Sequence, residues 1–205
     1  AADSNASSNT ITTGSNNLSI AGAEAGDLIT VNAAALLDNK TLTLSGAADI
    51  TVNNLIADIS ATNSGTLSVT LADAPAISIS SSGGSTTSID ATALADDRTL
   101  TVSGSDSTTI TGLQADLVAT NQTGALDVTT VAVAGLSIAT GSGSNTIHAE
   151  ALTDDQVLTL TGDDAATITL SAGDLNAATD SGVLTVTIAA DSNASSNTKI
   201  GRAHV

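Results

Sequence analysis

The chain has 205 residues, with 21 acidic side chains against 4 lysines and arginines, a net charge of -17, and no Phe, Trp, Tyr, Cys or Met. Charge of this sign repels nucleic-acid phosphates and there is no ring on which a base could stack, so nucleic acid is excluded as a partner. The lack of cysteine excludes disulfides and thiolate-bound metals. The sequence also lacks a run of about 18 apolar residues, so we expect no insertion into a membrane.

In chain order, residues 1–30 are interpreted as a partial repeat that leads into three similar segments, at 31–88, 89–146 and 147–198, the last one truncated. The segments open with VNAAALLDNKTLTLSG, IDATALADDRTLTVSG and IHAEALTDDQVLTLTG. Their closing glycines, Gly46, Gly104 and Gly162, recur at a constant interval (104 minus 46 and 162 minus 104 both give 58). Repetition at a fixed period of this length indicates stacked structural units.

Within each segment the hydrophobic pattern has a period of two. Aliphatic residues alternate with Thr or Ser in TLTVS at 99–103 and in VLTVTI at 183–188. This alternation predicts strands with one buried and one exposed face, and the bounding Gly, Asp, Asn and Ser residues are typical of strand ends. The Ala-rich piece at 33–37 is interpreted as a compact corner.

A single segment is too small to bury its own aliphatic row, whereas stacked copies form a continuous column of Leu, Ile and Val. The predicted fold class is therefore all-β. We expect a right-handed parallel β-solenoid (β-helix or β-roll-like) built from about three of these 58-residue repeats. Six strand-to-strand steps fill one repeat, which fits either three two-sided coils or two three-sided coils. The thin core of such a coil also accounts for the missing aromatic rings.

The last seven residues, 199–205, break this pattern and resemble the translation of a common short-read sequencing adapter. They are interpreted as an artefactual tail, and without them the chain is expected to be a fragment. The decapeptide AADSNASSNT occurs at both 1–10 and 189–198. This duplication fits either a longer repeat that begins again at position 189 or an assembly artefact.

The motifs LTLSG, ITGLQADLVATN, GALDVTT and SIATGSGSNTI give the chain a resemblance to the β-strand-repeat regions of very large bacterial surface and secreted proteins. Adhesin-like members of the RTX group and S-layer-associated proteins are of this kind. The resemblance covers essentially residues 1–198 and implies an extracellular or cell-surface location. RTX repeats of the form GGxGxDxUx hold Ca²⁺ between turns. The stretch TGSGSNTIH at 140–148 follows that form with Thr in place of the first Gly and Asn145 in place of Asp.

Acidic residues also recur at one turn of each segment. Oxygen ligands on a turn suit Ca²⁺, so Ca²⁺ is the one candidate cofactor, although none is required. The candidate ligands are Asp38, Asp96, Asp97, Asp154, Asp155 and Asn145. The competing interpretation is a solvated corner, for which Asp is simply a good turn residue. Lys40, Arg98 and Gln156 fall beside these acids and are expected to form local pairs.

The sequence contains no catalytic constellation: GxSxG is absent, and His148 has no second histidine beside it. We expect no enzymatic activity. The predicted function is a structural or adhesive stalk segment of a large extracellular bacterial protein. Its expected partners are neighbouring repeats of the same chain and cell-surface or matrix components. Three alternatives remain: a Ca²⁺-binding RTX-like segment, a β-helix enzyme acting on polysaccharides, and an ice-binding solenoid, the last suggested by Thr-x-Thr pairs such as Thr109/Thr111.

Overall fold

The computed structural model describes residues 7–188 and 200–201 of the chain. It is a β-solenoid with two parallel sheets, about nine turns of roughly 20 residues each, and no helix among the described residues. The prediction of an all-β parallel solenoid is confirmed. The presence of two sheets answers the question of coil width, because each turn contributes one strand to each sheet.

Strands of odd number form one ten-stranded sheet, the odd sheet, in the order β1 to β19. Its strands are β1 (Ser8–Thr12), β3 (Leu28–Asn32), β5 (Asp49–Leu55), β7 (Leu67–Leu71), β9 (Thr86–Asp90), β11 (Ser107–Leu113), β13 (Leu126–Thr130), β15 (Asn145–Ala149), β17 (Ala166–Leu170) and β19 (Leu184–Ile188).

Strands of even number form the second ten-stranded sheet, the even sheet, in the order β2 to β20. Its strands are β2 (Leu18–Gly22), β4 (Thr41–Gly46), β6 (Asp58–Asn63), β8 (Ala76–Ser81), β10 (Thr99–Gly104), β12 (Asp116–Gln122), β14 (Gly135–Ala139), β16 (Val157–Gly162), β18 (Asp174–Asp180) and β20 (Ile200–Gly201).

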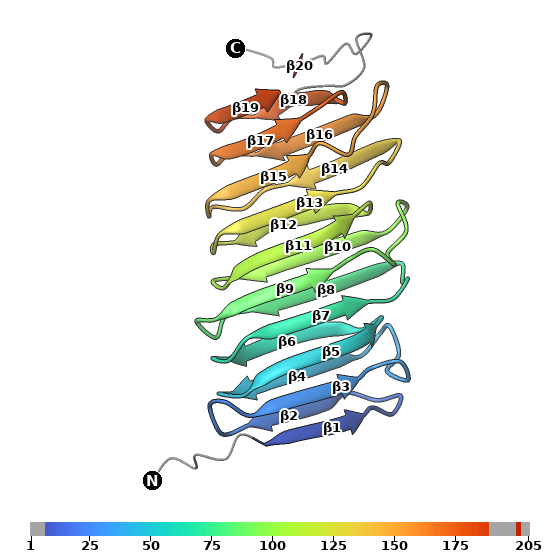
Figure 1. Cartoon of the computed structure of the whole chain (residues 1–205), viewed down its shortest axis with the longest axis vertical. Helices are drawn as coiled ribbons and strands as arrows, with labels where there is room; N and C mark the ends of the chain where they lie inside the picture. Colours follow the sequence, from blue (N-terminus) through green and yellow to red (C-terminus); the bar gives the residue numbers. More distant parts are fainter. Residues whose placement is uncertain (1–6, 189–199, 202–205) are drawn as a thin grey trace.

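The turns stack along the long axis of the molecule, and the two sheets lie face to face along its whole length (Figure 1). The alternation seen in the sequence turns every second side chain inward: Leu42 and Leu44 of β4 and Val52 of β5 are fully buried. All the fully buried aliphatic residues belong to one continuous core. Each turn therefore supplies one slice of a core that no turn could complete alone.

The corners that lead from the odd to the even sheet include three long ones, at 33–40, 91–98 and 150–156. Each buries a leucine under a tight backbone turn, together with an alanine at the start of the corner or, in the third case, at the end of β15. These residues are 0–1% exposed: Ala33, Leu36, Ala91, Leu94, Ala149 and Leu152. The leucine N–H donates to the alanine carbonyl three residues earlier, over 3.0 Å between Leu36 and Ala33. The Ala-rich pieces are thus compact corners.

The opposite corners, which lead from the even to the odd sheet, form what we call the glycine edge. Gly46, Gly104 and Gly162 end β4, β10 and β16 there with φ of 98°, 120° and 148°. A Cβ on Gly104 would lie 1.9 Å from the carbonyl oxygen of Ser81 in the preceding turn. The recurring glycines therefore satisfy a left-handed backbone and a close approach between turns.

Three turns of the odd sheet correspond to one sequence segment in length. Ile29 pairs with Ile50, Ile50 with Leu67, and Leu67 with Thr87. Three turns therefore span 58 residues (87 minus 29), which equals the distance in sequence between successive closing glycines. Of the predicted tail at 199–205, only Ile200 and Gly201 are described, as β20 beside β18. The second decapeptide copy and the end of the third segment lie outside the described residues.

No helix long and apolar enough to cross a membrane occurs in the part of the chain that the structure describes.

Candidate functional sites

The predicted acidic turn residues lie on the three long corners. Asp38, Asp96, Asp97, Asp154 and Asp155 all have exposed side chains. Successive long corners are three turns apart, and at about 4.8 Å per turn their carboxylates are separated by about 14 Å. No group of three or more acidic or histidine side chains with metal-binding geometry occurs among the described residues. The fold does not bring these acids together between corners, so Ca²⁺ binding by a single corner stays a prediction.

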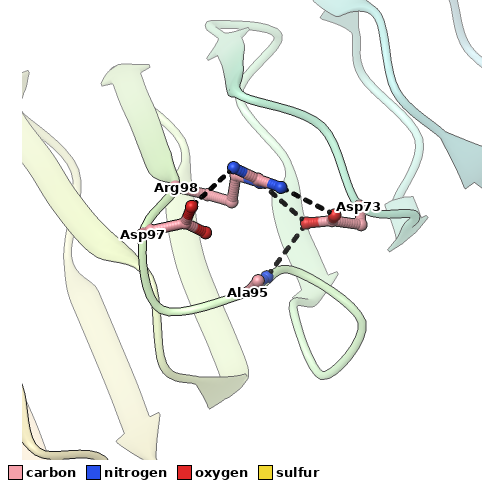
Figure 2. Close-up of polar contacts among 4 residues, drawn as sticks. All are labelled: Asp73, Ala95, Asp97 and Arg98. Atoms are coloured by element: carbon pink, nitrogen blue, oxygen red, sulfur yellow. Dashed lines mark hydrogen bonds and ion pairs between the residues drawn. The ribbon is translucent and has the colours of Figure 1, made fainter.

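One of these acids is already used in an ion-pair cluster (Figure 2). Arg98 Nη1 lies 2.8 Å from Asp97 Oδ2, while Arg98 Nε and Nη2 lie 3.0 and 3.1 Å from the two carboxylate oxygens of Asp73. Asp73 also accepts the backbone N–H of Ala95 over 3.2 Å. The hydrogen bond from Arg98 and that from Ala95 hold the pKa of Asp73 below its usual value. The local pairing predicted for Arg98 is present.

The other two segments vary this cluster. Ala132 stands at the position equivalent to Asp73, and Gln156 at the position equivalent to Arg98, so acid and base are replaced together. Gln156 turns back into its own corner, where its Oε1 accepts the Thr153 N–H over 2.8 Å. Lys40 forms no ion pair with any residue in the described ranges, so the pairing predicted for it is not found there.

Asn145, the candidate ligand in the glycine-rich stretch, is 2% exposed. Its Nδ2 donates to the carbonyl oxygens of Gly141, Gly143 and Ala165 at 2.9, 2.9 and 3.2 Å. The amide nitrogen, not the oxygen that a cation would need, therefore faces these carbonyls. Cβ atoms on Gly141 and Gly143 would lie 2.1 and 2.0 Å from carbonyl oxygens of the preceding turn, so close packing of turns explains both glycines.

Several other aspartates bond to the backbone of a neighbouring turn. Oδ1 of Asp49, Asp58 and Asp116 accepts the N–H of Thr66, Ser78 and Ser137 at 2.7, 2.8 and 2.9 Å. A short carboxylate at a strand end reaches an N–H that the ladder leaves unpaired. The sequence has 19 Asp against 2 Glu, and at these three positions the backbone bond favours Asp without a ligand.

A polar network inside the solenoid was not predicted. Asp106, at the glycine edge, is only 2% exposed. Its Oδ2 accepts the Ser81 hydroxyl at 2.7 Å and the Gly83 N–H at 2.9 Å, and its Oδ1 accepts the Gly84 N–H at 2.7 Å. The Thr87 hydroxyl donates to Ser81 Oγ over 2.9 Å, which extends the network into the odd sheet.

The same network continues into the following turn. Gln122, which is fully buried, donates through Nε2 to the main-chain oxygen of Asp106 at 2.5 Å and to Thr108 Oγ1 at 3.3 Å. Burial would raise the pKa of Asp106, but the hydrogen bonds from Ser81, Gly83, Gly84 and Ser85 outweigh it and lower that pKa. The carboxylate is thus an ionised anchor, enclosed by its donors and closed to substrate.

The signal for this interior was present but ambiguous. Asn63, Gln122 and Asp180 end the three ADL-type strands beside the closing glycines, and all are at most 5% exposed. Strict alternation points only Asn63 inward, whereas a one-residue irregularity in β12 and β18 turns Gln122 and Asp180 into the interior. Polar residues beside Gly and Ser at a strand end are indistinguishable from ordinary turn residues in sequence.

The outer face of the odd sheet carries a column of hydroxyl groups. Its members pair strand by strand: Thr10, Thr30, Thr51, Ser68, Ser88, Thr109, Asp127, Thr146, Thr167 and Thr185. Only Asp127 interrupts it. His148, half exposed in the adjacent column, lies 3.4 Å from Asp127 through Nε2 and 3.8 Å from Glu150 through Nδ1.

Compared with known proteins, the chain matches no family model, no curated protein and no solved structure.

Proposed function

We propose that the chain is a non-enzymatic stalk segment of a large extracellular bacterial repeat protein, acting as a spacer or an adhesive surface. The observation that carries the proposal is the stacking of all turns along one axis around an uninterrupted aliphatic core. Each turn adds length and almost no width, which suits a spacer. Ten stacked strands give a rod about 43 Å long from the first strand to the last.

The chemistry of the described side chains supports a passive role. Asp106, enclosed at the glycine edge, has its carboxylate oxygens filled by hydroxyl and backbone donors. The exposed acids on the long corners are dispersed along the rod, without the clustered acids and cations that polysaccharide hydrolysis requires. Neighbouring repeats of the same chain and cell-surface or matrix components are the partners we propose.

The proposal is tested by holding the chain of residues 1–205 between two handles and pulling along the rod. A stalk should resist before it unfolds, with distinct force peaks well above the thermal noise of the instrument. A featureless extension at low force would remove the load-bearing role. Adhesion of beads coated with the same chain distinguishes the two forms of the proposal. An adhesive surface would hold the beads on bacterial cells or matrix, whereas an inert spacer would not. Release of reducing sugar from polysaccharides would instead support the enzymatic alternative.

The hydroxyl column favours ice binding as a second candidate function. Nine of its ten members are Thr or Ser at the regular spacing of a parallel sheet, about 4.8 Å. The adjacent column is less regular, because it is interrupted by Asn32, Asn53, Asp90 and His148. Inhibition of ice recrystallisation by the whole chain, and its loss in Thr109→Asp, would support this candidate. Equal ice growth with and without the chain would eliminate it.

A further inference from the structure

The core of the even sheet is divided into groups of three strands. Within a group, equivalent residues pair directly: Leu42 with Ile59, Leu100 with Leu117, and Leu158 with Leu175. The groups are β2–β4–β6, β8–β10–β12 and β14–β16–β18. The first residues of these rows, Leu18, Ile77 and Leu136, are evenly spaced along the chain (77 minus 18 and 136 minus 77 both give 59).

Between groups the register slips by two residues. Ile59 pairs with Ile79 and not with Ile77, and Leu117 pairs with Ile138 and not with Leu136. Two residues along a strand correspond to about 6.6 Å. We call the two junctions, β6 with β8 and β12 with β14, the seams of the solenoid.

The backbone ladders are short at both seams. β6 and β8 pair over three residues and β12 and β14 over two, Leu117 with Ile138 and Val118 with Ala139. The neighbouring junctions are longer, for example six residues between β8 and β10 and five between β14 and β16. The odd sheet keeps four pairs between β7 and β9 and between β13 and β15, so it joins the groups. Its junctions β5–β7 and β11–β13 also keep four pairs each, with one register shift in each.

A single aspartate bridges each seam in the even sheet. At each seam the slip leaves one serine N–H without a ladder partner, and an aspartate accepts it. Asp58 Oδ1 accepts the Ser78 N–H at 2.8 Å, and Asp116 Oδ1 accepts the Ser137 N–H at 2.9 Å. These are the aspartates of the ADL-type motif. Asp58 and Asp116 are 58 residues apart, as are the closing glycines Gly46 and Gly104 (116 minus 58 and 104 minus 46). One such aspartate therefore recurs at each seam.

Two clusters of side-chain hydrogen bonds lie inside groups. The network of Ser81, Asp106 and Gln122 joins β8, β10 and β12 of the middle group. Asn145 bonds to Gly141, Gly143 and Ala165, which all belong to the last group. Polar ties therefore add stability within groups, while each seam relies on a short ladder and one carboxylate.

We propose that the seams are built-in opening points and that the solenoid yields in units of three turns, with Asp58 and Asp116 as the groups that hold each seam closed. For its biological use the inference rests on the proposed stalk function, since a loaded stalk would then extend in steps while its remaining units stay folded. The geometry of the seams does not depend on that function.

Force spectroscopy of the whole chain tests the inference through step length, whereas the stalk function is tested through the force itself. A unit of three turns should lengthen the chain by about 200 Å when it opens. Steps of about 70 Å, one turn at a time, or one step of about 650 Å would overturn the modular inference and leave the stalk function standing.

Substitution of a seam aspartate gives the matched comparison. Asp116→Ala should lower the force of one step and speed amide exchange in β14 by about twofold to tenfold. Asp49→Ala is the control, because Asp49 accepts the Thr66 N–H at 2.7 Å and the Thr66 hydroxyl at 2.8 Å in the odd sheet, outside both seams. Equal effects of the two substitutions on β14 exchange would overturn the role of the seam. Unchanged amide exchange of β14 in Asp116→Ala would also overturn it.

Discussion

At the residue scale, Asp106 shows how a buried charge is tolerated in a core made of aliphatic residues. An unpaired carboxylate in such a place is costly, but this one receives a hydroxyl and backbone N–H groups from the Ser81–Ser85 corner. Charge-assisted bonds of this kind are about twice as strong as neutral ones. The residue therefore fixes the corner of the preceding turn.

We expect Asp106→Asn to lower the free energy of unfolding by about 3 kcal/mol, because the amide puts N–H groups against N–H donors. Thermal or urea unfolding monitored by circular dichroism measures the change. Asp96→Ala is the control, since Asp96 is exposed and should change stability by less than about 0.5 kcal/mol. A loss as small for Asp106→Asn as for Asp96→Ala would contradict the anchoring role.

The same carboxylate predicts an acid dependence. Because its pKa is lower in the folded chain than in the unfolded one, its stabilising effect is present above the ordinary Asp pKa of about 3.9 and is lost as pH falls through the folded value. Wild type should therefore lose stability below about pH 4 more steeply than Asp106→Asn. Melting temperatures between pH 6 and pH 2.5 give the two slopes, and parallel slopes would contradict this assignment.

The corner acids lead to a different expectation. Asp154 and Asp155 are exposed, and Asp97 is committed to Arg98, so a single corner offers few ligands of the six to eight that Ca²⁺ takes. We expect millimolar Ca²⁺ to change the melting temperature by less than about 1 °C relative to a chelator, since weak binding stabilises little. A large rise that disappears in Asp154→Ala would instead establish the RTX-like alternative.

At the element scale, the glycine edge decides how closely two turns can approach. Gly104 combines φ of 120° with a carbonyl oxygen 1.9 Å from where its Cβ would lie. Gly135, at the start of β14, has no atom within 4 Å of an added Cβ. The two residues are a matched pair, one constrained and one free.

We expect Gly104→Ala to cost more than about 2 kcal/mol, because the left-handed backbone and the clash both oppose a side chain. Gly135→Ala should be neutral or slightly stabilising, since alanine restricts the unfolded chain and meets no obstacle. Chemical denaturation of both variants measures the difference. Similar stabilities for the two would show that the edge adjusts more readily than its geometry indicates.

The strands were predictable because alternation has a direct physical cause. In TLTVS the inward Leu100 and Val102 are at most 2% exposed, while Thr99, Thr101 and Ser103 lie on the outer side. The number of sheets was not predictable, because strand spacing alone fits both two-sided and three-sided coils. The register slip at the seams was equally hidden: Ile77 and Ile79 are both aliphatic, so either could pair with Ile59.

The functional reading of the acids shows the same limit. Asp58 and Asp116 bond to N–H groups of the next turn, and Asp106 to those of the preceding turn, so each contact joins residues that are a full turn apart in sequence. A sequence shows that aspartate recurs at a corner, but it does not show which backbone group the carboxylate meets. An aspartate in a solvated turn, a metal ligand and a backbone anchor therefore show the same sequence pattern, and only the stacking of the turns distinguishes them.

At the scale of the whole molecule, the absence of aromatic rings fits a thin core in which successive turns are stacked. Each slice of the core packs against the next, and within the middle group the column Ile77, Leu100 and Leu117 is at most 1% exposed. A ring in one slice would displace the slices above and below as well as its own. The composition thus reflects a constraint shared by all turns.

This constraint predicts that Leu100→Phe is destabilising although it adds apolar surface. Overfilling a close-packed core costs about 1–3 kcal/mol, and here the strain would reach both neighbours of β10, that is β8 and β12. Val118→Phe is the control, because Val118 is 37% exposed on the outer face of β12 and its ring would point to solvent. Unfolding of the two variants in urea, with amide exchange in β8 and β12, separates local from shared strain. If Leu100→Phe were as stable as wild type, the core would have spare width, and the missing aromatics would need a cause other than stacking.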